Sequence, residues 1–194
     1  MERYVDIHTH HPAAGSTTPL SAGIHPWDAE RFPATIPGLE DAEAIGEIGL
    51  DALRGPAREV QLAALRAQLR LACERELPVV LHCVKAFEPL MHELKACMPR
   101  AVIFHGFIGS PQQAQQALAQ GCYLSFGART FASPRTLDAL RSTPLDRLFV
   151  ETDEAPDPIG ELYARVAAAR GVTVDTLRRA TFENYERIFG KRNG

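Results

Sequence analysis

The sequence lacks several features that mark particular classes of protein. Its 194 residues are only 7% aromatic and carry a net charge of −3, and no apolar run approaches the ~20 residues of a membrane span. The near-balanced charge argues against a nucleic-acid coat protein or a polybasic membrane binder, and we expect no membrane partner. Neither G-x-G-x-x-G nor G-x-x-x-x-G-K-[ST] occurs, so nothing favours a Rossmann or P-loop nucleotide site.

Cysteine is also scarce, and its spacing excludes the usual thiolate metal motifs. None of the cysteines forms a C-x-x-C pair, and each lies in an apolar stretch, which predicts reduced, buried thiols at Cys73, Cys83, Cys97 and Cys122. The first residues contain no long apolar segment of the signal-peptide kind. Together these features predict a cytoplasmic protein.

What the sequence does contain is an alternation of short apolar runs and helical patterns. Continuous runs such as Val79-Val80-Leu81 are typical of parallel strands that are covered on both faces. Strands are predicted at residues 4–8, 21–25, 44–50, 79–83, 102–107, 123–127 and 148–153. Helices are predicted at residues 59–75 and 86–97, after Ser110-Pro111 and Ser133-Pro134, at residues 159–170, and in two terminal helices capped by Thr173 and Thr181. The pattern predicts one α/β domain over residues 1–194.

Side chains that bind metals recur near the ends of these predicted strands. Alternation along a strand places His8 and His10 on one face, and Glu47 lies inside an apolar strand where an unpaired carboxylate is costly. In a β/α barrel the carboxyl ends of the strands converge on one face, where active sites are built. The predicted metal ligands are His8, His10, Glu47, His82, His105 and Asp153.

The chemistry of these ligands narrows the choice of metal. Nitrogen and oxygen donors without thiolate suit Zn, Mn, Fe or Mg rather than a structural thiolate zinc site. The set is too large for one four-coordinate ion with an open position, and it suits two ions that share a bridging carboxylate. We therefore expect one or two divalent ions, which would lower the pKa of bound water toward ~7 and so supply hydroxide.

At this point the sequence resembles the TatD-like metal-dependent hydrolases, a branch of the amidohydrolase-like barrel enzymes. The resemblance covers most of the chain, in the order typical of the family. The matching segments are DIHTH (6–10), GIHP (23–26), AIGEIGLD (44–51), QLRLACERELPVVLHC (68–83), FHGFIGS (104–110), GCYLSFG (121–127), LFVETD (148–153) and NYERIFG (184–190).

The resemblance implies a TIM-type (β/α) barrel and hydrolysis of phosphodiesters, as by deoxyribonucleases and exonucleases. It implies one metal held by His8, His10, Glu47 and Asp153, and a second held by Glu47, His82 and His105, with Glu47 bridging. Asp153 would also orient or deprotonate the attacking water. The expected substrate is DNA or a small phosphodiester.

Several residues beside the ligands are candidates for substrate contact. Arg54, Lys85 and Arg129 follow predicted strands, where cations suit a phosphate or carboxylate substrate, although ordinary solvated loop charge is the competing interpretation. His25 ends the second predicted strand and is assigned either to substrate or to packing. Glu151 shares a face with Asp153 and is expected to lie deeper and to hydrogen-bond a ligand.

The chain departs from the family pattern mainly by deletion. About a dozen residues separate His10 from Gly23, where the family places a helix, a strand and a helix, and the loop after Asp153 is short. Because a full barrel needs ~250 residues, we predict a barrel reduced to about seven strands. Because the substrate side is open, two alternatives to a phosphodiester hydrolase remain: a metal-dependent amide or ester hydrolase, and a binding module without turnover. The sequence favours no particular oligomer.

Overall fold

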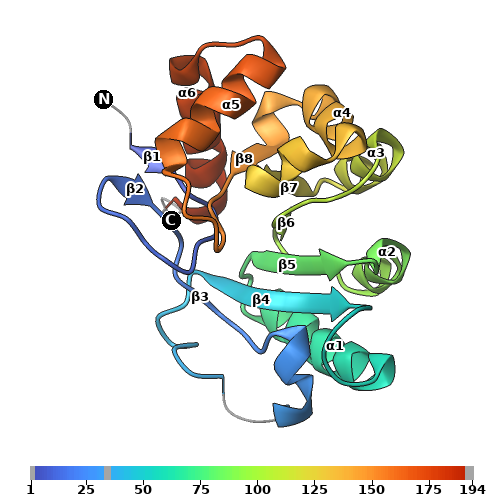
Figure 1. The fold of residues 1–194 in the computed structure, drawn as a ribbon. Helices are drawn as coiled ribbons and strands as arrows, with labels where there is room; N and C mark the ends of the chain where they lie inside the picture. Colours follow the sequence, from blue (N-terminus) through green and yellow to red (C-terminus); the bar gives the residue numbers. More distant parts are fainter. Residues whose placement is uncertain (1–2, 33–35, 191–194) are drawn as a thin grey trace. The chain divides into compact units, whose positions relative to one another are not determined.

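The computed structural model describes residues 3–32 and 36–190 and divides the chain into two compact units (Figure 1). The first unit combines residues 1–18 with residues 105–194, and the second comprises residues 19–104. Met1 and Glu2, at the start of the segment analysed for a signal peptide, lie outside the described residues. The single domain over residues 1–194 stays a prediction.

The second unit is a parallel sheet with helices. Its strands β3 (Ser21–Ala22), β4 (Ala44–Asp51), β5 (Val79–Val84) and β6 (Val102–Phe104) pair in this order, all parallel. The long helix α1 (Arg58–Glu74) packs against β4, and α2 (Phe87–Ala96) contacts β5 (Figure 1). Apolar side chains on β4 and on the first half of β5 are almost fully buried, as expected for strands covered on both faces.

Helix α1 is anchored to the strands by two buried glutamines as well as by its apolar face. The Gln68 side chain accepts a hydrogen bond from Ile24 N (2.7 Å) and donates to Ile24 O (3.1 Å). Gln61 accepts one from Asp51 N (2.8 Å). Because buried amides need partners, these contacts fix the ends of β3 and β4 against the helix.

The prediction of reduced thiols is wrong for two of the four cysteines. Cys73, in the last turn of α1, forms a disulfide with Cys97, which directly follows α2. The two helices follow successive parallel strands, which brings sulfur atoms together that lie 24 residues apart in the chain. Cys83 and Cys122 are free, as predicted.

The first unit contains two pairs of parallel strands and the remaining helices. Strand β1 (Tyr4–Val5) pairs with β2 (Ser16–Thr17), and β7 (Tyr123–Phe126) pairs with β8 (Leu148–Val150). The segment after β1 runs beside β8, because Ile7 N donates to Val150 O (3.2 Å). The α-helices of this unit are α3 (Pro111–Ala119), α4 (Pro134–Ser142), α5 (Ile159–Arg170) and α6 (Val174–Phe189).

Helix boundaries in this unit follow the predicted capping residues. Ser110 accepts a hydrogen bond from Gln113 N while the Gln113 side chain accepts one from Ser110 N, which is a capping box at the start of α3. Ser133 caps α4 in a similar way, and α5 ends at Gly171 in the left-handed conformation (φ 66°). The Ser-Pro signals are therefore confirmed.

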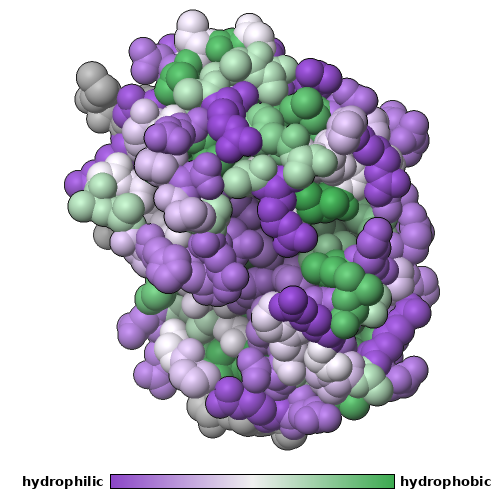
Figure 2. Space-filling model, in the orientation of Figure 1, coloured by the Kyte–Doolittle hydropathy of each residue, from purple (hydrophilic) through white to green (hydrophobic). Residues whose placement is uncertain are grey.

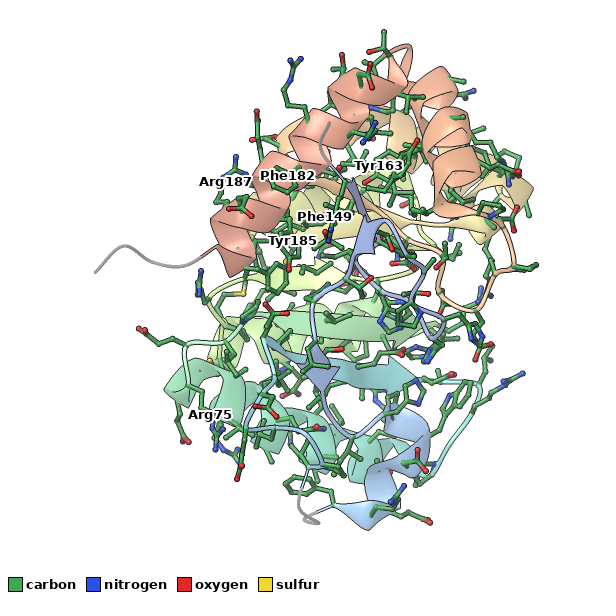
Figure 3. All side chains as sticks on the ribbon, turned by 90° about the vertical axis from the view of Figure 1, so that its left-hand side faces the viewer. Arg75, Phe149, Tyr163, Phe182, Tyr185 and Arg187 are labelled. Atoms are coloured by element: carbon green, nitrogen blue, oxygen red, sulfur yellow. A yellow bond between two sulfur atoms is a disulfide. The ribbon has the colours of Figure 1, made fainter. Side chains whose placement is uncertain are left out.

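The two predicted terminal helices are in fact one helix, α6, capped by Thr173. Thr181 does not start a new helix: its buried hydroxyl approaches Leu177 O (3.1 Å) inside α6 and lies 2.8 Å from the Tyr163 hydroxyl. A threonine hydroxyl that finds partners in the preceding turn is compatible with a helix interior. In Figure 3, Tyr163 points from α5 into the layer beneath the helices.

The predicted α/β class with parallel strands is confirmed, with changes in strand length. Every predicted strand segment contains strand residues, but β1 and β3 have only two residues each, and β2 was not predicted. Among the described residues, no helix combines the length and apolarity needed to cross a bilayer. The face in Figure 2 interleaves hydrophilic side chains with separate hydrophobic patches.

Candidate functional site

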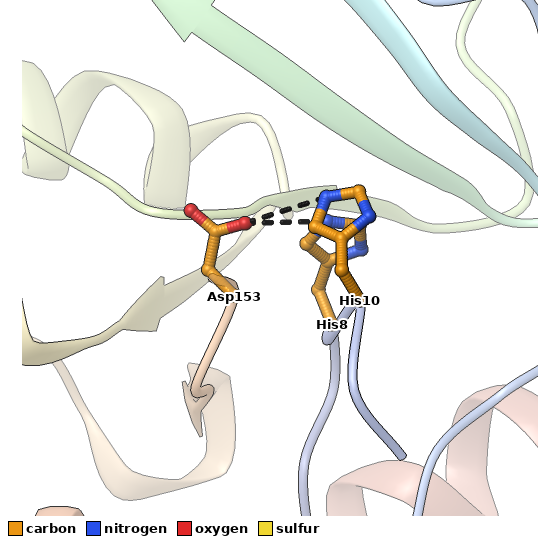
Figure 4. Close-up of side chains that lie close together, drawn as sticks. All are labelled: His8, His10 and Asp153. Atoms are coloured by element: carbon orange, nitrogen blue, oxygen red, sulfur yellow. Dashed lines mark ion pairs between the residues drawn. The ribbon is translucent and has the colours of Figure 1, made fainter. Parts of the chain in front are cut away.

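A carboxylate and two imidazoles converge in the first unit (Figure 4). Asp153 Oδ1 lies 3.7 Å from His8 Nε2 and 3.6 Å from His10 Nε2. Both distances exceed that of a hydrogen bond. Two ligands that each lie ~2.1 Å from one tetrahedral ion are ~3.4 Å apart, so the spacing fits atoms arranged around a metal ion. We call these three residues the Asp153 cluster.

The backbone places the Asp153 cluster at the ends of two neighbouring segments. Asp153 N donates to His8 O (3.0 Å), and His10 N donates to Asp153 O (3.1 Å). These bonds flank a bridge between Thr9 and Asp153, although the regular strand β1 already ends at Val5. Asp153 itself has a left-handed backbone (φ 55°), which is uncommon outside glycine and frequent at functional sites.

Asp6 supports the Asp153 cluster by binding Thr152, the residue before Asp153. It is buried, its Oδ1 accepts from Thr152 N (2.9 Å), and its Oδ2 accepts from Thr152 Oγ1 (2.7 Å). Burial raises the pKa of Asp6 to about 6, and the hydrogen bonds from Thr152 act in the opposite direction. This bonding role of Asp6 was not predicted from the sequence.

His105 has a buried carboxylate beside it in the same unit. Glu151 is 1% exposed, and its Oε1 lies 3.4 Å from His105 Nδ1. Glycines make room for this carboxylate: a Cβ on Gly106 would lie 3.2 Å from Glu151 Oε1, and one on Gly127 3.1 Å from Glu151 O. The predicted position of Glu151, deeper than Asp153, agrees with this burial. A carboxylate beside one ring nitrogen fixes the orientation of the His105 imidazole.

A second group of side chains that could hold a metal ion lies in the second unit and consists of His25, Glu47 and His82. Glu47 Oε1 lies 2.7 Å from His82 Nδ1 and 3.3 Å from His25 Nε2. The β4–β5 register shifts between Ile45 and Ile48, which is where Glu47 lies. Such an irregularity re-aims a side chain within a strand. We call this group the Glu47 cluster.

Asp51, at the end of β4, is the site residue that the sequence reasoning missed. It is 4% exposed, and its Oδ2 lies 3.2 Å from His82 Nε2. The other His82 nitrogen faces Glu47, so the ring lies between two carboxylates. The sequence signal for Asp51 was its position as the last residue of the AIGEIGLD segment. Burial by itself raises the pKa of Asp51. Hydrogen bonds from Trp27, Leu53 and His82 together outweigh burial and hold the pKa below its usual value.

Gly49 allows β4 to approach β5 next to His82. Its φ is 152°, and a Cβ at this position would collide with the backbone carbonyl oxygen of His82. Only glycine fits such a close approach with this backbone conformation. The glycine therefore allows the backbone of His82, from which its side chain extends, to lie close to β4.

The predicted substrate-contacting cations are all exposed. Arg54 follows β4 and Lys85 follows β5, while Arg129 lies in the short helix η2 (Ala128–Ala132) after β7. Lys85 has a left-handed backbone (φ 52°). His25, the remaining candidate, caps the helix η1 (Pro26–Arg31) and directs its Nε2 toward Glu47.

Both clusters offer only imidazole nitrogen and carboxylate oxygen donors. This donor set suits Zn, Mn, Fe or Mg. Within each cluster the donor atoms lie close enough together to be candidate ligands of a divalent cation. The types of donor atom fit the metal chemistry predicted from the sequence.

Comparison with known proteins places the chain in a family. Residues 13–190 match the family model of TatD-related DNases. The chain is 31% identical to the 3'-5' ssDNA/RNA exonuclease TatD of Citrobacter rodentium, over 93% of this chain and 79% of that protein. It is 40% identical to YjjV of Escherichia coli K12, described as an uncharacterized metal-dependent hydrolase, over 82% of this chain and 66% of that protein.

Solved structures agree with this assignment. The crystal structure of the TatD homologue YJJV from Escherichia coli K12 has a TM-score of 0.73 and 26% identity, covering 92% of this chain and 78% of that one. The family predicted from the sequence motifs is therefore confirmed. This chain belongs to the TatD-related DNase family.

Proposed function

We propose that this protein is a divalent-metal-dependent hydrolase that shortens single-stranded DNA or RNA from the 3' end. The observation that carries the proposal is the Asp153 cluster, in which one carboxylate oxygen lies within 3.7 Å of two imidazole nitrogens. Support comes from the membership of a DNase family and from relatives named as 3'-5' ssDNA/RNA exonucleases.

The predicted ligands remain our proposal for the residues that hold metal. When bound, a divalent ion would activate water and neutralise negative charge on the phosphodiester. The proposed ligands are all imidazoles or carboxylates and comprise His8, His10, Glu47, His82, His105 and Asp153.

The side chains themselves have distinct proposed tasks. Asp153 accepts the proton of the attacking water, since its side chain is 30% exposed and its backbone N and O are both fixed by hydrogen bonds. Glu47 is a ligand and, together with Asp153, one of the two catalytic carboxylates. Glu151 orients His105 through its Nδ1. Arg54, Lys85 and Arg129 attract the phosphodiester through their positive charge.

Two finer predictions go with this proposal. A TIM-type barrel reduced to about seven strands remains our prediction for the sheet, and the short loop after Asp153 predicts an open substrate side. A cytoplasmic location also remains a prediction.

The test is degradation of a short single-stranded oligonucleotide labelled at its 5' end, with Mg, Mn or Zn supplied after removal of metal by a chelator. We expect a ladder of products that shortens from the 3' end and appears only with metal. Asp153→Asn should lose this activity by at least 100-fold, because a positioned general base contributes about 10²–10⁴-fold. Glu47→Ala should lose metal and activity together.

The matched control is Asp138→Asn, which makes the same chemical change in an exposed residue paired with Arg141. It should leave the ladder unchanged. Wild-type protein that binds stoichiometric metal and leaves DNA and RNA intact would contradict the nuclease proposal. Turnover of amide or ester substrates by that protein would then favour an amide or ester hydrolase. Metal-independent binding of a partner, with no turnover, would favour a binding module.

A further inference from the structure

Trp27 is the one tryptophan of the chain, and it is held rigidly although 44% of it is exposed. Its backbone N donates to His25 Nδ1 (3.2 Å), and its indole Nε1 donates to Asp51 Oδ2 (2.7 Å). Both ends of the residue are thus fixed, one by His25 of the Glu47 cluster and the other by Asp51, which contacts His82 of that cluster. An exposed aromatic ring held in one orientation loses little entropy when another ring stacks on it.

The indole borders the imidazoles of the Glu47 cluster. Its ring centroid lies 4.6 Å from that of His25 and 6.0 Å from that of His82. Because the His25 Nδ1 accepts a hydrogen bond, a neutral His25 ring carries its proton on Nε2, which faces Glu47. A group that contacts Trp27 therefore lies next to residues proposed to bind metal.

Arg54 adds a cation to the same surface. Its guanidinium carbon lies 5.0 Å from the centroid of the Trp27 ring. The backbone N atoms of Leu53 and Arg54 both donate to Asp51 Oδ1, at 2.8 and 3.0 Å. The carboxylate that fixes the indole therefore also fixes this turn. Leu53 is 70% exposed and offers further apolar surface.

These three side chains complement a nucleotide. The indole provides a flat face for a base, the guanidinium stacks or pairs with phosphate, and the leucine provides apolar contact. An amide or ester substrate without a ring would use none of the aromatic surface. A cation–π contact with an arginine also covers many surface tryptophans that bind no ligand. The test therefore distinguishes such a contact from a surface that binds a base.

We propose that Trp27 and Arg54 form a nucleobase-stacking subsite beside the Glu47 cluster, which binds a base next to the scissile phosphodiester. This inference rests on the proposed nuclease function and makes Trp27 a determinant of substrate affinity. Stacking on an aromatic residue tolerates every base, so the subsite would recognise single strands without reading their sequence.

The test compares an ordinary single-stranded oligonucleotide with one that carries abasic residues at its 3' end, for wild type, Trp27→Leu and Trp27→Phe. Base stacking contributes about 1–3 kcal/mol, or roughly 5–150-fold in affinity. We expect Trp27→Leu to raise KM at least fivefold on the ordinary substrate and to leave KM on the abasic substrate nearly unchanged. Trp27→Phe, which keeps a ring but lacks the indole N–H, should retain much of the difference between the substrates.

Fluorescence provides a readout that does not depend on turnover. Because Trp27 is the sole tryptophan, quenching of its emission by an oligonucleotide reports directly on this ring. Asp153→Asn protein with metal should be quenched by the ordinary oligonucleotide and much less by the abasic one. Met98→Ala, at an exposed apolar residue of the same unit, is the control and should leave both KM values unchanged.

The outcomes separate this inference from the proposed function. If wild type cleaves both substrates with equal KM, or if Trp27→Leu changes both equally, the stacking subsite is wrong and the nuclease proposal stands. An effect on kcat alone would assign Trp27 to positioning Asp51 and would also overturn the inference. If wild type cleaves neither substrate, both proposals fail.

Discussion

Thr152 donates two hydrogen bonds to the Asp6 carboxylate, one from its backbone N to Oδ1 (2.9 Å) and one from its hydroxyl to Oδ2 (2.7 Å). Asp6 precedes His8 by two residues, and Thr152 precedes Asp153. The pair therefore connects the two segments that carry the Asp153 cluster, with Asp6 buried and Thr152 half-buried.

We expect Thr152→Val to weaken metal binding roughly 10–100-fold, the usual effect of removing a residue that orients ligands. Thr152→Ser keeps the hydroxyl and should restore affinity. Competition against a chelator of known affinity measures the change. Thr143→Val is the control, because its buried hydroxyl bonds Ala139 O at the end of α4, and it should leave metal affinity unchanged. Equal affinities for wild type and Thr152→Val would contradict the role given to this pair.

Gly49→Ala should be among the most destabilising single changes in the second unit. The new Cβ would collide with the His82 carbonyl, and the backbone conformation itself is unfavourable for alanine. Together these effects should cost about 3 kcal/mol in the free energy of unfolding. Gly121→Ala, also at positive φ but with open space around it, should cost only about 1 kcal/mol. Urea denaturation measures both, and equal losses would show that the collision relaxes.

Tyr163→Phe should destabilise the first unit although it removes a single atom. The hydroxyl donates to Val5 O (2.8 Å) and accepts from Val5 N (3.2 Å), and the residue is fully buried. Leaving buried polar groups without a partner costs about 1–3 kcal/mol. Tyr123→Phe, whose hydroxyl accepts from the Arg147 guanidinium at 3.3 Å, should cost less. Thermal unfolding compares the two, and the reverse order would contradict this ranking.

The ion pair between Arg66 and Glu93 predicts a pH dependence of stability. Arg66 donates two hydrogen bonds of 2.7 Å to the Glu93 carboxylate, and these bonds lower the pKa of Glu93. A lowered pKa in the folded state means stabilisation that is complete above the unfolded pKa of about 4.3 and is lost as pH falls through the folded pKa. Arg66→Met should therefore lower stability at neutral pH and have little effect in strong acid.

Denaturant titrations at several pH values check this expectation. Arg141→Met breaks an exposed pair with Asp138, in which both side chains are more than half exposed, and should show almost no pH-dependent difference. A constant difference between wild type and Arg66→Met from neutral to acid pH would assign the Arg66 effect to packing of its aliphatic stem instead of charge.

The sequence predicted those parts of the fold that depend on local chemistry. Serine–proline pairs mark the starts of α3 and α4, and a glycine marks the end of α5, because capping uses only neighbouring residues. Thr181 was wrongly predicted to start a helix, because a threonine hydroxyl that can cap a helix can also bond within one. Its contact with Tyr163 depends on tertiary packing that no local pattern contains.

The candidate site shows the same division. The sequence offered candidate imidazoles and carboxylates from their places in and after the predicted strands, but not their bonding partners. Asp51 resembles an ordinary strand-ending aspartate in the sequence, and its contacts with Trp27 and His82 join residues 24 and 31 positions away. The Cys73–Cys97 disulfide was missed for a similar reason, since its spacing follows from helix packing.

The bonding of Asp51 has a consequence for protein engineering. This carboxylate holds the turn after β4 through the backbone N atoms of Leu53 and Arg54, and makes no use of their side chains. Residues 53 and 54 are therefore the natural positions for a randomised library, since their side chains can vary while the loop keeps its shape. Residue 51 should be left unchanged in such a library, because its replacement would disturb Trp27 and His82 together.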